Sequence, residues 1–455
     1  MRAGAVRCGL LLLVAAFLVG CSTVRPWINQ PNKELTPAIA PVDGDERDPS
    51  ILMAVIFSGG GARAAAFGYG VLEELQASRF MWNGQERNLL QKVDLVGGVS
   101  GGSIMAAYLA TYGEKGLGRF EHEYLRRDFQ DSLLNYALRP GNLVSLTSPW
   151  FGRSHLLAER LDALYQSATF GDLARRPGHP ELLITATDMS LGTGFDFSKS
   201  QFDLICSKLE DVPVSFAVAA SSAVPLLLSP VTLRNFAGEC PPPAQQGDAW
   251  DDYRTRLYRD QARSYLDSKN RPYIHLVDGG LSDNLGVRRM LDSALADGGL
   301  RPTLLRTGIA PGTIRKLVLI SVNSERDPSA NIDMSDRLPG TAEVLDTLLF
   351  GAGARATKET QEFLADLTRQ WKSELAQRYH GGQDVFAPDA QVHVIQVNLR
   401  DAPDVVQRRK LLQVPTALSI SDQDVTQLIG AGRTILSESP EFKNLMQALR
   451  QDAPR

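Results

Sequence analysis

The sequence contains few of the residues that build metal centres or a dense disulfide framework. Its 455 residues include only six histidines and four cysteines, and these are too scattered for a zinc site. There is also no excess of positive charge, because 48 basic residues face 52 acidic ones, so nucleic-acid binding has no electrostatic basis. Hydrophobic residues make up 43% and charged residues 22%, which is ordinary for globular proteins and excludes wholesale disorder.

Residues 1–20 are typical of a secretory signal peptide. Two arginines precede an apolar run over residues 10–19, which is shorter than the roughly 20 residues that span a bilayer. The run ends in Leu18-Val19-Gly20-Cys21 and resembles the bacterial lipobox, whose cysteine is lipidated. Ser22 is not the aspartate usually associated with inner-membrane retention. The resemblance therefore implies a bacterial cell-envelope lipoprotein, anchored through Cys21 to the outer membrane and facing the periplasm. A plain secretory signal with a chance cysteine is the alternative.

The segment after the signal is expected to connect an anchor to a domain. Residues 21–50 comprise the lipidated cysteine and a stretch rich in Pro, Asn, Asp and Glu, which predicts a flexible tether. Of the other cysteines, Cys8 leaves with the signal, and Cys206 and Cys240 remain. In an oxidising compartment these two could form a disulfide, and two separately buried thiols are the alternative.

From residue 51 onward, short apolar runs alternate with helical patterns. Buried apolar strands separated by helices are typical of a parallel sheet that is covered on both faces. We therefore expect an α/β fold with a mainly parallel central sheet and helices on both faces. The predicted strands are 52–57, 93–97, 182–187, 274–277, 317–322 and 392–397. The predicted helices are 64–77, 101–111, 155–165, a broken helix over 341–378, and 423–437.

A glycine-rich loop follows the first predicted strand, as Ser58-Gly59-Gly60-Gly61-Ala62-Arg63-Ala64. Glycines permit positive φ and close approach, and the start of the next helix offers free N–H donors to an anion. The spacing Gly59-x-Gly61-x-x-Ala64 also satisfies a dinucleotide-binding fingerprint, which is weak on its own. The loop alone leaves two interpretations open, a dinucleotide site or an oxyanion hole.

A second glycine-flanked motif, Gly98-Val99-Ser100-Gly101-Gly102, lies between the strand 93–97 and an apolar helix. This is G-x-S-x-G in the strand–turn–helix setting of a nucleophile elbow, which lifts the serine hydroxyl above the sheet edge. A glycine-rich turn with an incidental serine is the alternative. A base could come from Asp278, which ends the strand 274–277 and precedes two glycines, although that aspartate could simply shape a turn.

Together these motifs resemble the patatin-like phospholipase family over roughly residues 52–290. A G-G-G-x-[RK] loop, a G-x-S-x-G elbow and a D-G-[GA] turn occur in the family's order, joined by the family-like block Ala220–Pro225. The resemblance implies a patatin-like, α/β-hydrolase-related three-layer sandwich, with the catalytic domain over residues 51–325. We expect residues 326–455 to form a C-terminal extension of helices and strands that packs on the same domain.

The resemblance also implies a Ser-Asp dyad without histidine, in which Ser100 is the nucleophile and Asp278 the general base. Because a free aspartate has a pKa of about 3.9, burial would have to raise it for this residue to act near neutral pH. No metal or other cofactor is expected. The rest of the implied site consists of Gly98 and Gly102 at the elbow, the N–H groups of Gly59, Gly60 and Gly61 as the oxyanion hole, and Arg63 as the support of that loop.

A Ser-His-Asp triad is the mechanistic alternative. His380 and His393 both follow Asp278, which is the chain order of α/β-hydrolases. The simpler interpretation of each is a surface or packing histidine. His275 lies in the strand that leads to Asp278 and is interpreted as a core residue.

Two apolar segments have alternative interpretations. Trp150-Phe151, with Leu143, Val144 and Leu146 before them, could line an acyl groove, and we favour a place in the core. The segment Pro241–Arg271 looks like an insertion whose stripe could be a lid or a membrane-facing patch, and we favour packing on the domain. The stripe consists of Trp250, Tyr253, Leu257 and Tyr265.

We expect a lipid-anchored serine acyl hydrolase that cleaves acyl esters of phospholipids or lysophospholipids. A thioesterase or short-chain esterase with the same site is one alternative, and a catalytically silent envelope scaffold lipoprotein is another. The intact Ser100, Asp278 and glycine loop argue against the scaffold. The expected partners are the acyl-ester substrate and a membrane reached through Cys21, with no nucleic acid.

Overall fold

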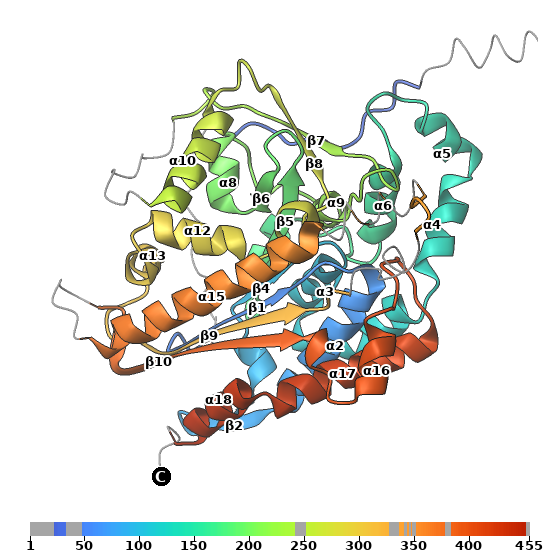
Figure 1. Cartoon of the computed structure of the whole chain (residues 1–455). Coiled ribbons are helices and arrows are strands. Elements are labelled where there is room, and N and C mark those ends of the chain that lie inside the picture. The colour runs from blue at the N-terminus through green and yellow to red at the C-terminus, as the bar shows by residue number, and fades with distance from the viewer. Residues whose placement is uncertain are drawn as a thin grey trace, which may run out of the picture.

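The fold is described from a computed structural model that places residues 22–32, 48–241, 252–326, 336–340, 344, 347, 352–377 and 384–451. Within these ranges an eight-stranded sheet has the order β10-β9-β1-β4-β5-β8-β7, with β6 also paired to β5 (Figure 1). The neighbours from β10 to β5 run parallel, whereas β6, β7 and β8 join through antiparallel pairs. The strands are β1 Ile51–Phe57, β4 Leu95–Gly98, β5 Glu181–Asp188, β6 Thr193–Phe197, β7 Val231–Arg234, β8 Tyr273–Val277, β9 Ile314–Asn323 and β10 Phe386–Asn398, and β2 Arg79–Trp82 with β3 Gln85–Asn88 forms a separate hairpin.

Helices cover both faces of the sheet (Figure 1). The α-helices are α2 Gly61–Ala77, α3 Gly101–Gly116, α4 Phe129–Ala137, α5 Pro140–Ser145, α6 Arg153–Asp162, α7 Phe170–Ala174, α8 Lys199–Leu204, α9 Val214–Ser221, α10 Tyr253–Leu266, α11 Gly280–Asp283, α12 Arg288–Ala296, α13 Leu300–Arg306, α15 Ala352–Ala376, α16 Val405–Leu411, α17 Asp422–Glu438 and α18 Pro440–Gln451. Short 3₁₀ or π turns are η1 Leu89–Lys92, η2 Leu117–Arg119, η3 Glu121–Leu125 and η6 Leu399–Asp401. None of the described helices is long and apolar enough to cross a membrane.

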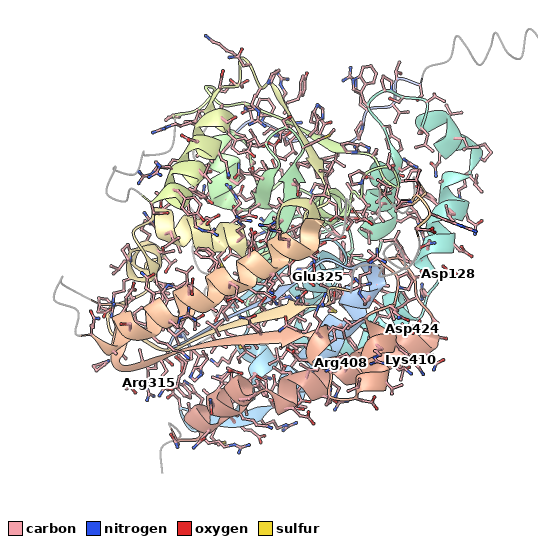
Figure 2. All side chains as sticks on the ribbon, in the orientation of Figure 1. Asp128, Arg315, Glu325, Arg408, Lys410 and Asp424 are labelled. Carbon is pink, nitrogen blue, oxygen red and sulfur yellow. A yellow bond between two sulfur atoms is a disulfide. The ribbon has the colours of Figure 1, made fainter. Side chains whose placement is uncertain are left out.

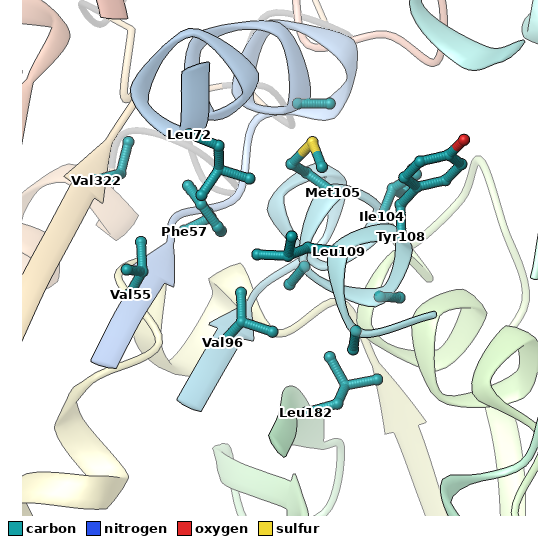
Figure 3. Packing of buried hydrophobic residues seen from close by; sticks show 14 of the residues in the cluster. Val55, Phe57, Leu72, Val96, Ile104, Met105, Tyr108, Leu109, Leu182 and Val322 are labelled. Carbon is teal, nitrogen blue, oxygen red and sulfur yellow. The ribbon is translucent and has the colours of Figure 1, made fainter. Parts of the chain in front are cut away.

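The central strands are apolar because both of their faces are buried. On β1, Met53, Val55 and Phe57 join the core under α2 and α3, while the alternating Ile56 joins a second core with α12 and α15. Figure 3 shows the first core, in which Leu72 and Leu109 lie near the strand side chains. The predicted α/β class, with a mainly parallel sheet between helices, is therefore confirmed.

The C-terminal part of the chain contributes to this sheet and core. β10 pairs with β9 in parallel register from Gln391 to Asn398, and α17 packs along α2. Leu428 and Leu436 of α17 are buried in the same core as β1. The sheet is thus completed by residues that lie beyond the region of sequence resemblance.

The start of the described chain is packed on the domain, which differs from the expected flexible tether. Trp27 lies against Phe216 with ring centroids 4.6 Å apart. Asn29 is buried and its side chain donates to the Ser207 hydroxyl at 2.9 Å and to the Arg234 carbonyl at 2.8 Å. These buried polar contacts hold residues 22–32 in place because breaking them would leave unpaired groups. Cys21 and residues 33–47 lie outside the described part.

The first of the two apolar segments differs from the expectation that it belongs to the core. Leu143, Val144 and Trp150 are exposed, and within that segment Phe151 is buried, stacked on His155. In the insertion, by contrast, α10 packs on the domain through buried Tyr265, whose hydroxyl donates to Asp188 at 2.9 Å. Tyr253 and Leu257 of the same helix are exposed, and Trp250 is outside the described residues.

A disulfide joins Cys206 and Cys240, whose Cα atoms are 5.8 Å apart. It ties the end of α8 to the chain after β7, beside the buried ring of Phe236. Asn32 donates its backbone N–H to the Cys206 carbonyl at 2.7 Å, so the packed N-terminal segment also rests on this loop.

We expect reduction of this disulfide to lower the free energy of unfolding by about 3–4 kcal/mol, because the bridge closes a loop of 34 residues in the unfolded chain. Thermal melts with and without reductant would measure the effect. The double variant Cys206→Ala/Cys240→Ala should melt at the temperature of the reduced protein and be insensitive to reductant. Equal melting temperatures for the oxidised and reduced wild type would contradict the expectation.

Candidate active site

Ser100 lies at the sharp turn between β4 and α3. Its backbone has φ of 51° and ψ of −123°, a strained combination for a residue with a side chain, as a nucleophile elbow requires. The turn is tight because a Cβ on Gly98 would be 2.6 Å from the Gly102 backbone, and one on Gly102 would be 2.4 Å from the Ser58 carbonyl oxygen. These close approaches explain why the flanking residues are glycines.

Asp278 follows β8 and reaches the same level of the sheet from the opposite direction. Gly98 pairs with Ile184 on β5, so Ser100 is level with Ala186. β8 is antiparallel to β5 and Val277 pairs with Thr187, so the next residue, Asp278, also comes opposite Ala186. The sequence predicted that Asp278, at the carboxyl end of a strand, could reach the elbow of a neighbouring strand. The residue does come to the elbow, but an antiparallel strand carries it there.

The Asp278 carboxyl group is buried, with 8% of the residue exposed. Burial raises its pKa to about 6, against the opposing effect of hydrogen bonds from the Gly280 N–H and the Ser100 hydroxyl. Oδ1 accepts from the Gly280 N–H at 2.8 Å, whereas Oδ2 is buried with no partner of full hydrogen-bond geometry among the described residues. The Ser100 hydroxyl is thus close to the carboxylate but imperfectly aligned, as catalytic hydrogen bonds often are before substrate binds.

Ser221 links the elbow to the sheet. Its hydroxyl accepts from the Ser100 N–H at 2.8 Å and donates to the Thr185 carbonyl at 2.6 Å. The Ser221 carbonyl accepts from the Gly279 N–H, and the Ala223 carbonyl accepts from the Asp278 N–H, both at 3.0 Å. The block Ala220–Pro225 therefore positions both the nucleophile and the candidate base. The sequence marked this block only through the family resemblance and gave it no role.

The glycine-rich loop offers two free N–H groups. The Gly59 N–H donates to the Asn284 carbonyl at 3.0 Å, so it is already engaged. Within the described chain, no acceptor contacts the N–H groups of Gly60 and Gly61. Of the three N–H donors expected from the sequence, Gly59 is thus already engaged, which could not be inferred locally because its acceptor is distant in sequence, and Gly60 and Gly61 are the donors left for an anion.

Arg63 holds this loop to distant parts of the chain. Its buried guanidinium donates through Nε to the Ser324 carbonyl at 2.8 Å, through Nη1 to the Val414 carbonyl and through Nη2 to the Thr416 hydroxyl at 3.2 Å. Burial lowers its pKa to about 9, which still leaves it charged at neutral pH. The sequence gave no local signal for residues 414–417, whose role depends on long-range folding.

Of the two histidines of the alternative triad, His393 does not lie beside Ser100. His393 on β10 is level with Val318 and Met53, about four residues before the end of β1, or roughly 13 Å along the strand. Across the sheet, β10 also lies three strand spacings of about 4.8 Å each from β4, the strand that leads to Ser100. His393 is therefore far from Ser100. His275 is exposed on β8 and its Nδ1 contacts the Thr232 hydroxyl at 3.0 Å, not the core. His380 lies outside the described residues.

An apolar cavity of about 390 Å³ opens next to Asp278. Val277, the residue before Asp278, is part of its wall, and so is Thr187, whose hydroxyl donates to the Gly279 carbonyl at 3.3 Å. The other apolar wall residues are Met189, Pro225, Leu226, Leu228, Pro230 and Leu281. The sequence suggested an acyl groove only as the less favoured alternative for residues 143–151, and none of these residues is part of this wall. Among the described residues, no group of three or more His, Cys, Asp or Glu side chains could hold a metal ion.

The sheet topology and the strained serine between glycines define the class as an α/β protein with a nucleophile elbow. A family model for the patatin-like phospholipases matches residues 55–291, just over half of the chain. The chain therefore belongs to the patatin-like phospholipase family, as the motifs predicted. Membership also removes the dinucleotide-binding interpretation of the glycine loop.

Solved structures with a similar arrangement share little sequence with this chain. Human GIVD cytosolic phospholipase A2 is 14% identical with a TM-score of 0.47, over 90% of this chain and 64% of that one. VipD from Legionella pneumophila is 13% identical with a TM-score of 0.33, over 88% and 67% respectively. ExoU from Pseudomonas aeruginosa, in complex with SpcU, is 17% identical with a TM-score of 0.26, over 75% of this chain and 60% of that one. The chain thus spans less than two thirds of the human chain's length, and no curated protein sequence matches it.

Gly61→Ala should lower the rate at which a fluorophosphonate probe labels Ser100 by roughly 10²-fold, the effect of losing an oxyanion donor. Gly61 has φ of 59°, and a Cβ there would be 2.2 Å from the Ala417 carbonyl oxygen, so the loop must move. Gly312→Ala is the matched control, because Gly312 has φ of 69° but open space around it. Equal labelling rates for the two variants would argue against a catalytic role of this loop.

Labelling of Ser100 should fall on acidification with a midpoint near pH 6. A general base acts only when deprotonated, and burial raises the pKa of Asp278 to about 6, so activity is present above this pH and lost below it. Labelling rates between pH 4.5 and pH 8 would measure this loss of activity on acidification. The thermal stability recorded at each pH would serve as the control for unfolding. A rate that stays constant down to pH 4.5 would be inconsistent with this assignment.

Proposed function

We propose that this protein is a serine acyl hydrolase that cleaves acyl ester bonds of phospholipids or lysophospholipids through a Ser100-Asp278 dyad. The observation that carries the proposal is the pairing of a strained serine with a buried carboxyl whose pKa is raised to about 6. Such a carboxylate is largely ionised at neutral pH and basic enough to accept a proton. Membership of the patatin-like phospholipase family supports the same reaction class.

The proposed reaction has two steps. Asp278 Oδ2 takes the proton of the Ser100 hydroxyl as Oγ attacks the ester carbonyl carbon, and the negative charge on the carbonyl oxygen is stabilised by the N–H groups of Gly60 and Gly61. The bond to the alcohol breaks, and the alcohol leaves with the proton from Asp278. Water then attacks the carbonyl carbon of the acyl-serine while Asp278 accepts its proton. The bond to Oγ breaks as Asp278 passes that proton to Oγ, so the fatty acid leaves and both Ser100 and the Asp278 carboxylate are restored.

The apolar cavity favours an acyl chain of lipid length. Its wall continues from Val277, directly before Asp278, so a chain bound there ends near Ser100. Because the same dyad would cleave any activated acyl group, a thioesterase or short-chain esterase is the second candidate. A catalytically silent scaffold would have no need for a strained serine beside a buried carboxylate, which costs stability.

We further propose that Cys21 is lipidated and holds the protein at the outer membrane, facing the periplasm. The lipobox-like run before Cys21 supports this, and the Cys206–Cys240 disulfide is compatible with an oxidising compartment. Several acyl chains on one cysteine would give stable anchoring, since two lipid signals already suffice.

Hydrolysis of a long-chain phospholipid, a matching thioester and a short-chain ester would test the proposed activity. We expect phospholipid cleavage that Ser100→Ala and Asp278→Asn each reduce by at least roughly 10³-fold, because each removes one half of the dyad. His393→Ala should retain full activity, since His393 is distant from Ser100.

Circular dichroism of the inactive variants would establish that they remain folded. Substantial activity in Asp278→Asn would exclude the dyad. Cleavage of only the thioester or the short ester would favour the second candidate, and inactivity on all three would favour the scaffold.

A further inference from the structure

The segment 134–150 is exposed although it contains a single charged residue, Arg139. It comprises the end of α4, all of α5 and the following turn, and we call it the α4–α5 ridge. Five of its large apolar side chains are 44–67% exposed: Leu134, Leu138, Leu143, Val144 and Trp150. Single exposed apolar residues are ordinary, but a group of this size on one feature indicates an interaction surface.

Leu134 of α4 and Leu138, which caps its C-terminal end, point away from the domain, whereas Leu133 packs against the core. Ser132 and Tyr136, four residues apart and hence on one face, contact α6 through hydrogen bonds with Arg160 and Glu159. Leu134 and Leu138 follow each of these by two residues, which is roughly 200° around the helix. The face that carries them is therefore directed outward.

The described chain begins at this ridge. The Ser22 N–H donates to the Thr147 hydroxyl at 3.1 Å, and the Ser148 hydroxyl donates to the Val24 carbonyl at 2.7 Å. The guanidinium of Arg25 lies 3.5 Å from the centre of the Trp150 ring. In Figure 1 the blue N-terminal segment accordingly runs to the side of the molecule where α5 projects. Residue 21, the candidate lipid attachment site, directly precedes Ser22.

The apolar surface continues from the ridge to the active site. Arg153, just after Trp150, donates through Nη2 to the Leu226 carbonyl at 2.6 Å. Leu226 and its neighbour Leu227 are 63% and 66% exposed. Leu226 also forms part of the wall of the cavity beside Asp278. The loop 224–230 thus connects the ridge to the mouth of the candidate acyl site.

The opposite end of α4 is polar. Asp128 caps its first turn by accepting from the Asp131 N–H at 3.0 Å. Figure 2 shows Asp128 on the same side of the molecule as Asp424 and Lys410, above both of them. Over residues 134–153, the ridge and the three residues after it, the charged residues are two arginines, Arg139 and Arg153. Apolar side chains interspersed with arginine suit the interface of a bilayer with anionic headgroups.

We propose that the α4–α5 ridge and the loop 224–230 dock on a lipid bilayer and turn the mouth of the acyl cavity toward it. The occupant is a membrane surface because the chain leaves the fold, toward its candidate lipid anchor, at this same ridge. The role of the cavity rests on the proposed function, whereas the docking itself requires no turnover.

Tryptophan fluorescence of the full-length chain in vesicles would test this proposal. The chain would carry Ser100→Ala, so that lipid is not consumed, and the vesicles would contain phosphatidylethanolamine and phosphatidylglycerol with or without bromine on the acyl chains. We expect brominated lipid to quench the Trp150 signal severalfold, with Trp150→Phe defining the contribution of that ring. Leu138→Asp/Val144→Asp should abolish this quenching.

Tyr253→Asp/Leu257→Asp on α10 is the matched control, because these exposed apolar residues lie on another helix. This variant should be quenched like the parent. With Ser100 intact, the ridge variant should hydrolyse vesicle phospholipid roughly tenfold more slowly and a short soluble ester at the unchanged rate.

Absence of Trp150 quenching would overturn the docking proposal, and so would loss of quenching only in the α10 variant. Sedimentation velocity in detergent would measure the oligomeric state of the parent and of the ridge variant. A parent dimer that becomes a monomer in the ridge variant would show that a second copy of the chain covers the ridge, and this result would also overturn the docking proposal. Ser100-dependent ester hydrolysis in the same preparations would show that the proposed activity stands even if the docking does not.

Discussion

The buried carboxyl of Asp278 beside the hydroxyl of Ser100 is the interaction on which much of this structure depends. A carboxylate in an apolar site is costly unless it is paired, and here one oxygen is held by a backbone N–H while the other has no full partner. The arrangement requires two strands of opposite direction to end at one level of the sheet, so that β4 brings the serine and β8 the aspartate. The packed sheet and its two cores maintain this geometry against its local cost.

The loop that faces this pair is stabilised by segments far away in the sequence. Arg63 contacts Ser324 after β9 and the segment 414–417, and the Ala62 N–H donates to the Ala417 carbonyl at 2.7 Å. The region matched by the family model ends at residue 291, so these supports lie beyond it. A site of this kind is therefore built by the whole domain, although its reactive groups occupy three short motifs.

Much of the fold could be predicted from the sequence because its central strands are buried on both faces and read as apolar runs. The strands 52–57, 182–187 and 317–322 correspond to β1, β5 and β9. The short strands β6 and β7 were missed, since β6 reads Thr-Gly-Phe-Asp-Phe, without a continuous apolar run. The direction of β8 could not be inferred either, because strand direction depends on long-range pairing.

In the candidate site, too, features set by local sequence could be predicted, whereas features set by distant contacts could not. The glycines around Ser100 and Asp278 were recognisable because backbone crowding leaves no room for a side chain. The roles of Ser221, Asn284 and residues 414–417 were not, since each acts through a hydrogen bond to a group remote in sequence. The exposed positions of Leu143 and Val144 were also mispredicted, because an apolar helix face reads alike whether a core or another surface covers it.

The attachment of Ser22 to Thr147 has a consequence for reach. A lipoprotein with a long unstructured linker can sample a volume tens of ångströms across and act on a facing membrane. Here Ser22, the first described residue, is already hydrogen-bonded to the domain surface. Anything bound at position 21 is held within about one residue length, roughly 3.8 Å, of that surface. With the lipid that we propose on Cys21, so short a connection would confine the domain to the leaflet that holds this lipid and would leave opposing membranes out of reach.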